Sequence, residues 1–181
     1  PEAQQDRFMF KILIPYPTWE EEFQIMEMTR AEPWASVEPV ISGEELLEVQ
    51  SIVRQVPVAQ HLVDYAMRLA RKSRAGTEQQ VPRFIRQWVR WGIGPRGCQF
   101  MLLAARARAL LRGRYHVAAE DIDAVAKPIM RHRLVTPFIA ASDNITTDDI
   151  VEQLIQDTPA RRGPLSADER IQEALRPPTS Q

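Results

Sequence analysis

The chain has 181 residues, of which 44% are hydrophobic and 26% charged, and its formal net charge at pH 7 is −1. These values are typical of a globular domain and argue against a global attraction to nucleic acid or to an anionic membrane. The single cysteine, Cys98, excludes an internal disulfide. Because no apolar run reaches about 18 residues and no signal peptide is recognisable, we expect a cytoplasmic protein without a membrane span.

The first predicted element is a β-strand over residues 7–15, "RFMFKILIP". Its two alternating sets of side chains are both mostly apolar, a pattern that is typical of a strand buried on both faces, as in a parallel sheet. Because a single strand cannot form a sheet, we expect its partner strands to lie in sequence upstream of Pro1.

Everything after Pro17 is predicted to be helical or loop. Two capping boxes, Thr18 with Glu21 and Ser42 with Glu45, begin the first two helices. A proline-containing loop over residues 30–41 separates them, and Pro57 ends the second helix. The positions predicted to face inward are Trp19, Phe23 and Met26 in the first helix and Leu46, Val49 and Val53 in the second.

The apolar spacing predicts four further elements that pack together. A helix with Val58, Leu62, Tyr65, Ala66 and Leu69 inward is followed by a long connection over residues 76–95, with a short helix or strand around 84–91. Three later helices are predicted. The first begins at Pro95 and is closed by Gly113, the second runs from about Ala119 to Pro128, and the third runs from a cap at Thr146 or Thr147 to Pro159.

The predicted organisation has three parts. Residues 1–17 are interpreted as the C-terminal remnant of an α/β core, residues 18–158 as a helical domain, and residues 159–181 as a flexible tail that is polar and flanked by prolines.

A long stretch without acidic residues lies in the middle of the helical domain. Between Gln79 and Ala119 there is no Asp or Glu, but there are eight arginines: Arg83, Arg86, Arg90, Arg96, Arg106, Arg108, Arg112 and Arg114. These arginines are either solvated helix faces or, as a group, a surface for an anionic neighbour. Interleaved with Phe84, Trp88 and Trp91 they could bind nucleic acid by phosphate contacts and stacking, although the net charge argues against that.

The sequence contains no self-contained catalytic centre. Walker A, HExxH, GxSxG and CxxC motifs are all absent, and the histidines His61, His116 and His132 are too far apart in sequence to predict a shared metal site. Cys98, at the start of a predicted helix, is interpreted as an ordinary buried cysteine, with a reactive thiolate as the alternative.

Two arginines nevertheless occupy positions where function is expected. Arg96 lies at a helix N-terminus, where the dipole disfavours a cation unless an anion bridges the two, so it either contacts a phosphate or turns outward to water. Arg7 lies at the very start of the predicted strand, and strand ends in α/β proteins often carry function; the alternative is that Arg7 forms a surface pair with Asp6.

Several stretches, taken in order, resemble the C-terminal part of the MoxR family of AAA+ ATPases. They are "PEAQQDRFMFKILIPYPTWEEE", "WGIGPRGCQFMLLAARARALLRGRYHVAAEDIDAVAKPIMRHRL" and "ITTDDIVEQLIQDTP". The resemblance implies that Arg7 is the arginine finger that reaches the nucleotide of the neighbouring subunit. It also implies that Arg96 is the sensor 2 residue on the γ-phosphate, with Gly94 and Pro95 forming its turn.

The resemblance also implies a fold and a mode of action. The fold would be mainly α, a helical-bundle AAA+ lid domain preceded by the last strand of an α/β P-loop core. The parent protein would form a homo-oligomeric ring, for example a hexamer, bind ATP and Mg²⁺, and remodel other proteins like a chaperone, with a von Willebrand factor A domain protein as a partner. Without Walker A and Walker B, this chain alone would not hydrolyse ATP, and a catalytically silent interaction domain is the alternative.

The chain departs from the family pattern at three places. Gly94 replaces the usual Ser, Gly97 replaces the usual Ala, and Ala118 and Ala119 replace a Thr-Pro cap. A glycine after Arg96 weakens the helix start by roughly 0.5–1 kcal/mol, and the lost cap costs about 1 kcal/mol.

Overall fold

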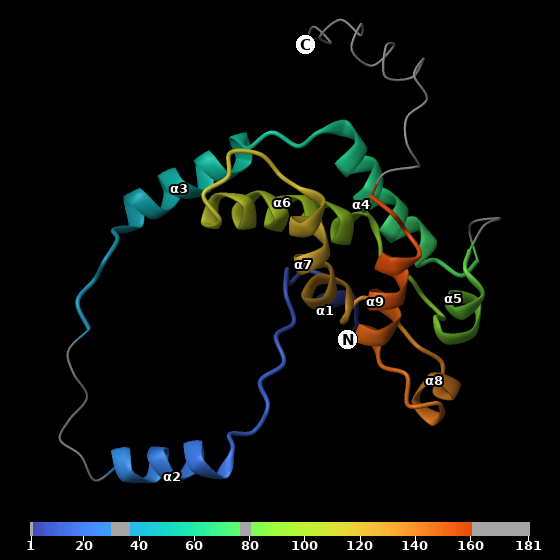
Figure 1. The fold of residues 1–181 in the computed structure, drawn as a ribbon, viewed down its shortest axis with the longest axis horizontal. Coiled ribbons are helices and arrows are strands. Elements are labelled where there is room, and N and C mark those ends of the chain that lie inside the picture. The colour runs from blue at the N-terminus through green and yellow to red at the C-terminus, as the bar shows by residue number, and fades with distance from the viewer. Residues whose placement is uncertain (1, 30–36, 77–80, 161–181) are drawn as a thin grey trace, which may run out of the picture.

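The structure is a computed structural model that describes residues 2–29, 37–76 and 81–160, with side chains from residue 4 onward. Within these residues all regular elements are helices and no strand is formed (Figure 1). The helices are α1 (Glu2–Gln5), α2 (Trp19–Met28), α3 (Gly43–Gln55), α4 (Gln60–Lys72), α5 (Arg83–Trp88), α6 (Pro95–Leu111), α7 (Ala119–Met130), α8 (Phe138–Ser142) and α9 (Thr147–Gln156).

The hydrophobic core lies between α4, α6, α7 and α9. The most extensive contact joins α6 to α7, α4 packs on α6, and α9 closes the bundle against α7. The predicted inward face of α4 is confirmed, since Leu62, Tyr65, Ala66 and Leu69 are all buried. Small residues on α6, which include Ala104, Ala105 and Ala109, allow α7 to approach closely with its larger side chains, such as Ile122, Ile129 and Met130.

The connection between α4 and α6 contains the short helix predicted there. Phe84 and Ile85 on α5 enter the core, and the indole N–H of Trp88 donates to Asp143 Oδ2 at 3.2 Å beyond α8. Trp91 forms an isolated antiparallel bridge with Val135, although its side chain is 72% exposed. The burial of Phe84 and Ile85 explains why this short helix packs on the bundle, and the bridge to Val135 fixes the backbone of Trp91.

Helices α2 and α3 have their predicted caps but not their predicted burial. Both capping boxes are confirmed, with Thr18 and Ser42 receiving the N–H groups of Glu21 and Glu45. No residue of either helix is buried, and Figure 1 shows α2 standing apart from the bundle. The prediction that one face of each helix is buried is therefore wrong. Helix α3 contacts α6 without burying any of its own residues, and α2 makes no comparable contact with the bundle. Exposed members include Trp19, Phe23, Met26, Leu46 and Val49.

The strand predicted over residues 7–15 is not formed, because residues 7–9 turn at the end of α1 and residues 10–15 form no β-ladder. Phe8, Ile12 and Ile14 are 71%, 74% and 88% exposed, so the expected burial on both faces is not formed. The physical reason is that a strand requires a neighbouring strand, and the described residues supply none. The segment contacts the bundle through Phe8 and Met9, and also at Lys11, whose N–H donates to the Pro128 carbonyl at 2.9 Å.

Helix ends follow the sequence signals with one exception. Thr146 caps α9 through Asp149, and Gly113, with φ of 69°, follows α6 as predicted. Pro128, by contrast, does not end α7, which continues to Met130. Because Pro128 lies in the last turn, its missing N–H removes only one helical hydrogen bond. The loop residues 30–36 and all of the tail beyond residue 160 lie outside the described residues.

Candidate functional site

The turn that precedes α6 is fixed by the C-terminal end of α4. The Ile93 N–H donates to Ser73 Oγ at 3.1 Å, and Arg74 Nε donates to the Ile93 carbonyl at 2.9 Å. A Cβ atom on Gly92 would lie 2.3 Å from the Ser73 carbonyl oxygen, so only glycine fits there. The bundle thereby sets the direction in which α6 begins.

The first turn of α6 carries Arg96 on an N-terminus that no side chain caps. Gly94 is the N-cap residue and Pro95 occupies the first helical position, as expected from the sequence. Gly94 has no side-chain oxygen to cap the first turn, where the Gly97 N–H donates to the Gly94 carbonyl at 3.1 Å, and no acidic residue lies in that turn. The positive end of the helix dipole is therefore available to an anion.

The anion next to Arg96 in this structure is Asp6. Arg96 Nη1 lies 3.0 Å from Asp6 Oδ2, and the Arg96 side chain is 47% exposed. The other oxygen of the same carboxylate, Oδ1, accepts from Arg133 Nε at 2.9 Å. The alternatives predicted from sequence, Arg96 turned only to water and an Asp6–Arg7 surface pair, are both wrong here, because Asp6 joins two arginines of the bundle.

Arg7 lies directly beside this cluster with its side chain exposed. Its N–H donates to the Gln4 carbonyl at 3.1 Å in the turn that follows α1. Among the described side chains, none forms a hydrogen bond or ion pair with the Arg7 guanidinium. The structure therefore brings the segment of Arg7 to the same end of the bundle as Arg96, although the two are far apart in sequence.

The comparisons with known proteins agree with this architecture. Residues 85–154 match the family described as the AAA lid domain. The chain is 36% identical over 156 residues to Chaperone MoxR1 of Mycobacterium tuberculosis, covering 86% of this chain and 41% of the relative. It is 30% identical to the YeaC protein of Bacillus subtilis, covering 86% and 46%, respectively.

A solved structure shares the fold as well as the sequence. A crystal structure of a Cytophaga hutchinsonii protein assigned as an ATPase superposes with a TM-score of 0.79 at 28% identity, covering 88% of this chain and 48% of that one. The chain corresponds to the C-terminal region of MoxR-family AAA+ ATPases, with an AAA lid domain. It spans less than half the length of each of these proteins.

The two positions at which this MoxR-family lid departs from the usual turn have different environments. No atom lies within 4 Å of where a Cβ on Gly94 would be, so a serine would fit there. A Cβ on Gly97 would lie 3.2 Å from Arg133 Cδ and 3.3 Å from Ile93 Cδ1. Because Gly97 has no Cβ, the Arg133 side chain can pack closely against α6. The same glycine lowers the helix propensity at the start of α6.

The missing Thr-Pro cap of α7 is partly compensated. Asp121 Oδ2 accepts the Ala118 N–H at 2.9 Å, and both Asp121 oxygens also accept from Arg114, at 2.6 and 2.8 Å. Burial alone would raise the pKa of Asp121, but these hydrogen bonds and the charges of Arg114 and Arg108 together lower it. A buried carboxylate therefore holds the start of α7 in place of the usual cap.

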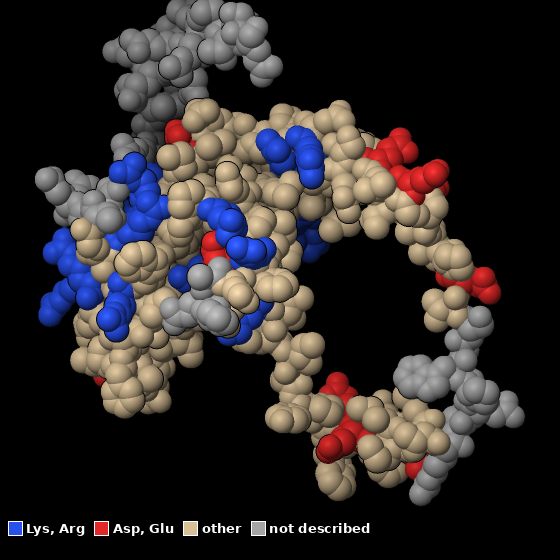
Figure 2. Space-filling view, turned by 180° about the vertical axis from the view of Figure 1, so that it is seen from behind, with Lys and Arg blue, Asp and Glu red and all other residues tan. Residues whose placement is uncertain are grey.

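Three arginines of the arginine-rich stretch pair with acidic residues elsewhere in the chain, and a fourth donates to a backbone carbonyl. Arg108 and Arg114 face Asp121, Arg96 faces Asp6, and Arg106 donates to the Arg54 carbonyl. Figure 2 shows the basic side chains gathered on the bundle, with acidic ones on the part of the chain that contains α2 and α3. Of the aromatic residues expected to interleave with the arginines, Phe84 is buried and cannot stack on a base.

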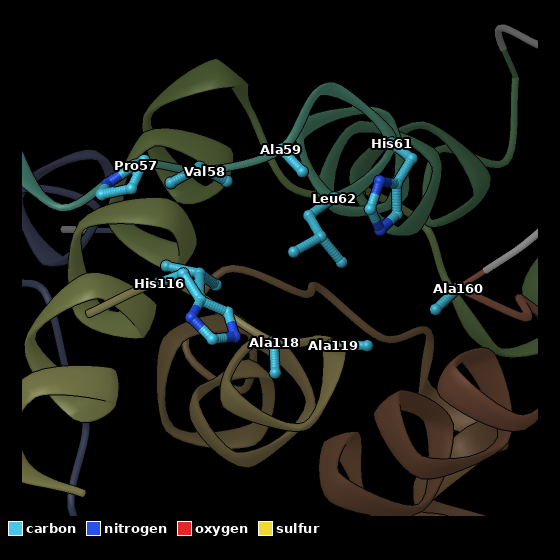
Figure 3. A pocket seen from close by; sticks show the side chains of 10 residues that line it. Pro57, Val58, Ala59, His61, Leu62, His116, Ala118, Ala119 and Ala160 are labelled. Atoms are coloured by element: carbon cyan, nitrogen blue, oxygen red, sulfur yellow. The ribbon is translucent and has the colours of Figure 1, made fainter. Parts of the chain in front are cut away.

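An open apolar pocket lies at the opposite end of α6 from Arg96. It has a volume of about 510 Å³ and is lined by the start of α4 and the loop before α7, with His61 and His116 at its margin (Figure 3). Among the described residues that line it, these two histidines alone offer polar side chains. Within the part of the chain that is described, no group of three or more His, Cys, Asp or Glu side chains is arranged to hold a metal ion.

The structure also bears on the reactivity of Cys98 and on the possibility of a membrane-spanning helix. Burial raises the pKa of the Cys98 thiol, which disfavours the reactive thiolate considered as an alternative. No helix among the described residues is both long and apolar enough to cross a bilayer.

Sequence reasoning missed Asp6, His132 and Arg133 as members of this site. From the sequence, Asp6 is paired only with Arg7, His132 is weighed only as a metal ligand, and Arg133 lies only within a stretch that resembles the family. The available signal was the basic run "RHR" at a helix C-terminus, where cations meet unpaired carbonyls. The identity of those carbonyls, from a segment more than a hundred residues away, could not be predicted from spacing.

Proposed function

We propose that this chain supplies the arginine finger, Arg7, and the sensor 2 arginine, Arg96, of a ring-forming MoxR-like ATPase that remodels partner proteins like a chaperone. ATP and Mg²⁺ would be bound mainly by a P-loop core outside this chain, for which the segment 7–15 would be the last strand. A cytoplasmic location and a von Willebrand factor A domain partner belong to the same proposal.

The observation that carries the proposal is the pairing of Arg96 with Asp6. Arg96 stands at an uncapped helix N-terminus, half-exposed, and is held by a single oxygen of an aspartate. A phosphate would interact with the same guanidinium and with the positive end of the α6 dipole, where no side chain caps the helix. Arg96 is therefore suited to exchange one anion for another, as a nucleotide sensor must.

The residues at the site fit a nucleotide phosphate but not, on their own, a magnesium ion. Arg96 can bind a terminal phosphate, while Asp6 is already shared by two arginines. Magnesium prefers oxygen ligands from carboxylates and phosphates, so it would have to be held by the core and the nucleotide. Bound ATP would supply the phosphoryl group that is transferred to water.

Arg7 would act on the neighbouring subunit. Its exposed guanidinium has no partner among the described side chains, so it is available to an active site formed between subunits. An arginine supplied in trans stabilises charge that develops on the transferred phosphoryl group, an effect that can reach about 10³–10⁵ in rate. Arg96 would report nucleotide occupancy to the lid, and the lid would pass the motion around the ring.

The test is ATP turnover by the full-length protein that carries this sequence. We expect Arg7→Ala and Arg96→Ala to lose turnover while the protein still assembles and binds nucleotide. Arg112→Ala is the matched control, because Arg112 is exposed at the far end of the same helix as Arg96. Mixing Arg7→Ala subunits with subunits that lack the Walker B acid should restore turnover, since the finger and the active site then come from different subunits.

Normal turnover by both alanine variants would overturn the site assignments. If the full-length sequence has no Walker A motif, the alternative hypothesis of a catalytically silent interaction domain is favoured. Steeply salt-dependent binding of single-stranded DNA would favour the nucleic-acid module instead.

A further inference from the structure

The segment Asp6–Lys11, here called the finger segment, is held to the bundle by the C-terminal end of α7. The last carbonyls of a helix have no partners within it. The Pro128 carbonyl accepts the Lys11 N–H at 2.9 Å. In return, Arg131 Nη1 donates to the Lys11 carbonyl at 3.1 Å, and His132 Nε2 lies 3.0 Å from the Phe8 carbonyl oxygen. Within the part of the chain that the structure describes, the segment therefore docks on the terminus of a helix.

Arg133 makes the largest share of these contacts. An arginine has five N–H donors, and the contacts of Arg133 engage all three of its nitrogens with five acceptors. Nε donates to Asp6 Oδ1, Nη2 to the carbonyls of Asp6 and Phe8, and Nη1 to the carbonyls of Met9 and Ile129. Its side chain is only 2% exposed, so these bonds are protected from competing water.

The position of Arg7 follows directly from this arrangement. One nitrogen, Arg133 Nη2, binds the carbonyl before Arg7 at 2.8 Å and the carbonyl after it at 2.6 Å. The backbone on both sides of Arg7 is therefore fixed to the turn that follows α7, while the Arg7 side chain is exposed. No other described side chain binds the backbone on both sides of Arg7.

Arg133 is itself fixed by the helix that carries Arg96. Its guanidinium lies over the Phe100 ring at 5.2 Å, and its side chain packs where a Cβ on Gly97 would be. Asp6 closes the connection, with one oxygen on Arg133 and the other on Arg96. The beginning of α6, the end of α7 and the finger segment thus form one interlocked unit.

We propose that Arg133 is a positioning residue for the arginine finger, which couples the backbone on both sides of Arg7 to the lid. The proposal rests on the function proposed above for Arg7. Any nucleotide-driven movement of the lid would then carry Arg7 with it, and the finger of one subunit would report the state of its own nucleotide to its neighbour.

The first experiment uses the full-length protein and the variant Arg133→Lys. Lysine keeps the charge but cannot bind the carbonyls on both sides of Arg7 at once. We expect kcat to fall roughly 10–100-fold, the cost of misplacing a reacting group by about 1 Å, with KM and nucleotide Kd within about twofold. In an Arg7→Ala background the same change should cause no further loss, because Arg133 acts through Arg7.

A matched control separates positioning from general destabilisation. Arg114→Lys also weakens an arginine that binds α7, through the buried Asp121, but none of the contacts of Arg114 reaches the finger segment. We expect Arg114→Lys to lower the melting temperature at least as much as Arg133→Lys does, and to leave kcat within about twofold. An equal loss of kcat in both variants, or a loss that adds to that of Arg7→Ala, would overturn the proposal.

The second experiment is independent of ATP turnover and uses the 181-residue chain. Amide hydrogen exchange is measured at Arg7, Phe8 and Lys11, whose N–H groups are bonded in this structure. Faster exchange at these three amides in Arg133→Lys, with α4 and α6 unchanged, supports the positioning role even if Arg7→Ala proves active and the proposed function fails. Unchanged exchange at the three amides overturns the positioning role whatever the turnover.

A second variant covers the case in which Arg133→Lys does not fold. His132→Ala removes one contact to the Phe8 carbonyl and leaves the Arg133 cluster in place. We expect the same direction of change in exchange at Phe8 and in kcat, with a smaller size. No change in either measurement would count against the docking of the finger segment on α7.

Discussion

Two parts of this chain carry the same kind of amphipathic pattern but have different fates. In the bundle formed by α4, α6, α7 and α9, the apolar side chains are buried in one core. In α2 and α3 the caps form as the sequence indicates, yet no side chain of either helix is buried. A capping box is satisfied within four residues, whereas burial requires a partner surface. A helix can therefore form its N-terminal cap by itself, whereas the burial of its apolar face depends on the rest of the protein.

The largest effect that sharpens this comparison is expected in the core. Leu69→Ala on α4 removes a fully buried side chain and should lower the free energy of unfolding by about 3–5 kcal/mol. Phe23→Ala on α2, where Phe23 is 60% exposed, should change it by less than about 0.5 kcal/mol in the 181-residue chain. Urea unfolding of both variants is the measurement. Equal losses would mean that α2 packs against the bundle in solution.

The acidic residues of the two parts should differ in the same way. Asp121→Asn leaves Arg114 without its buried carboxylate and should cost about 2–3 kcal/mol at pH 7. The pKa of Asp121 is lowered in the folded state, so its contribution is present above the ordinary value of 3.8 and is lost as pH falls through the lower, folded-state value. The difference between wild type and variant should therefore shrink in acid.

The control for Asp121 is an acid in the peripheral part. Glu45→Gln changes the capping box of α3, where the carboxylate is exposed, and we expect little effect on global unfolding. Circular dichroism during urea unfolding at pH 7 and pH 3 compares the two variants. A difference for Asp121→Asn that is independent of pH would contradict the proposed role of the ion pair.

Glycines give a third contrast, of intermediate size. Gly92→Ala places a Cβ against the Ser73 carbonyl and should destabilise the bundle by about 1–3 kcal/mol. Gly43→Ala, at the first position of α3, meets no atom within 4 Å and should be neutral or stabilising by up to about 0.5 kcal/mol. Thermal unfolding of both variants tests the contrast. A tolerated Gly92→Ala would show that the turn before α6 can move away from α4.

The same contrast explains what could be predicted from the sequence. Caps at Thr18, Ser42 and Thr146 and the buried face of α4 were predictable because their signals are local. The strand over residues 7–15 was not formed, because β-structure depends on partners outside the segment. Arg7 and Arg96 remain predictions that rest on resemblance, and the residues that connect them were not predictable from local pattern. Asp6 and Arg133 are 127 positions apart and meet only through the docking of the finger segment.

The smallest expected effect concerns the pH dependence of that docking. His132 touches the Phe8 carbonyl through Nε2, while its Nδ1 is buried without a described hydrogen-bond partner. Burial lowers the pKa of His132 below 6.5, with Arg133 and Lys11 lowering it further, while the Phe8 carbonyl and Asp6 act in the opposite sense.

Because the folded-state pKa of His132 is lowered, its neutral form is favoured in the docked state. The stabilising contribution should be complete above pH 6.5 and be lost as pH falls through the folded-state value. Amide exchange at Phe8, corrected for the intrinsic pH dependence of exchange, should therefore become faster in mild acid, and His132→Gln should remove this extra dependence. Titration of His132 by NMR at a pKa of 6.5 or above would contradict the argument, since a proton on the buried Nδ1 would then be tolerated without loosening the finger segment.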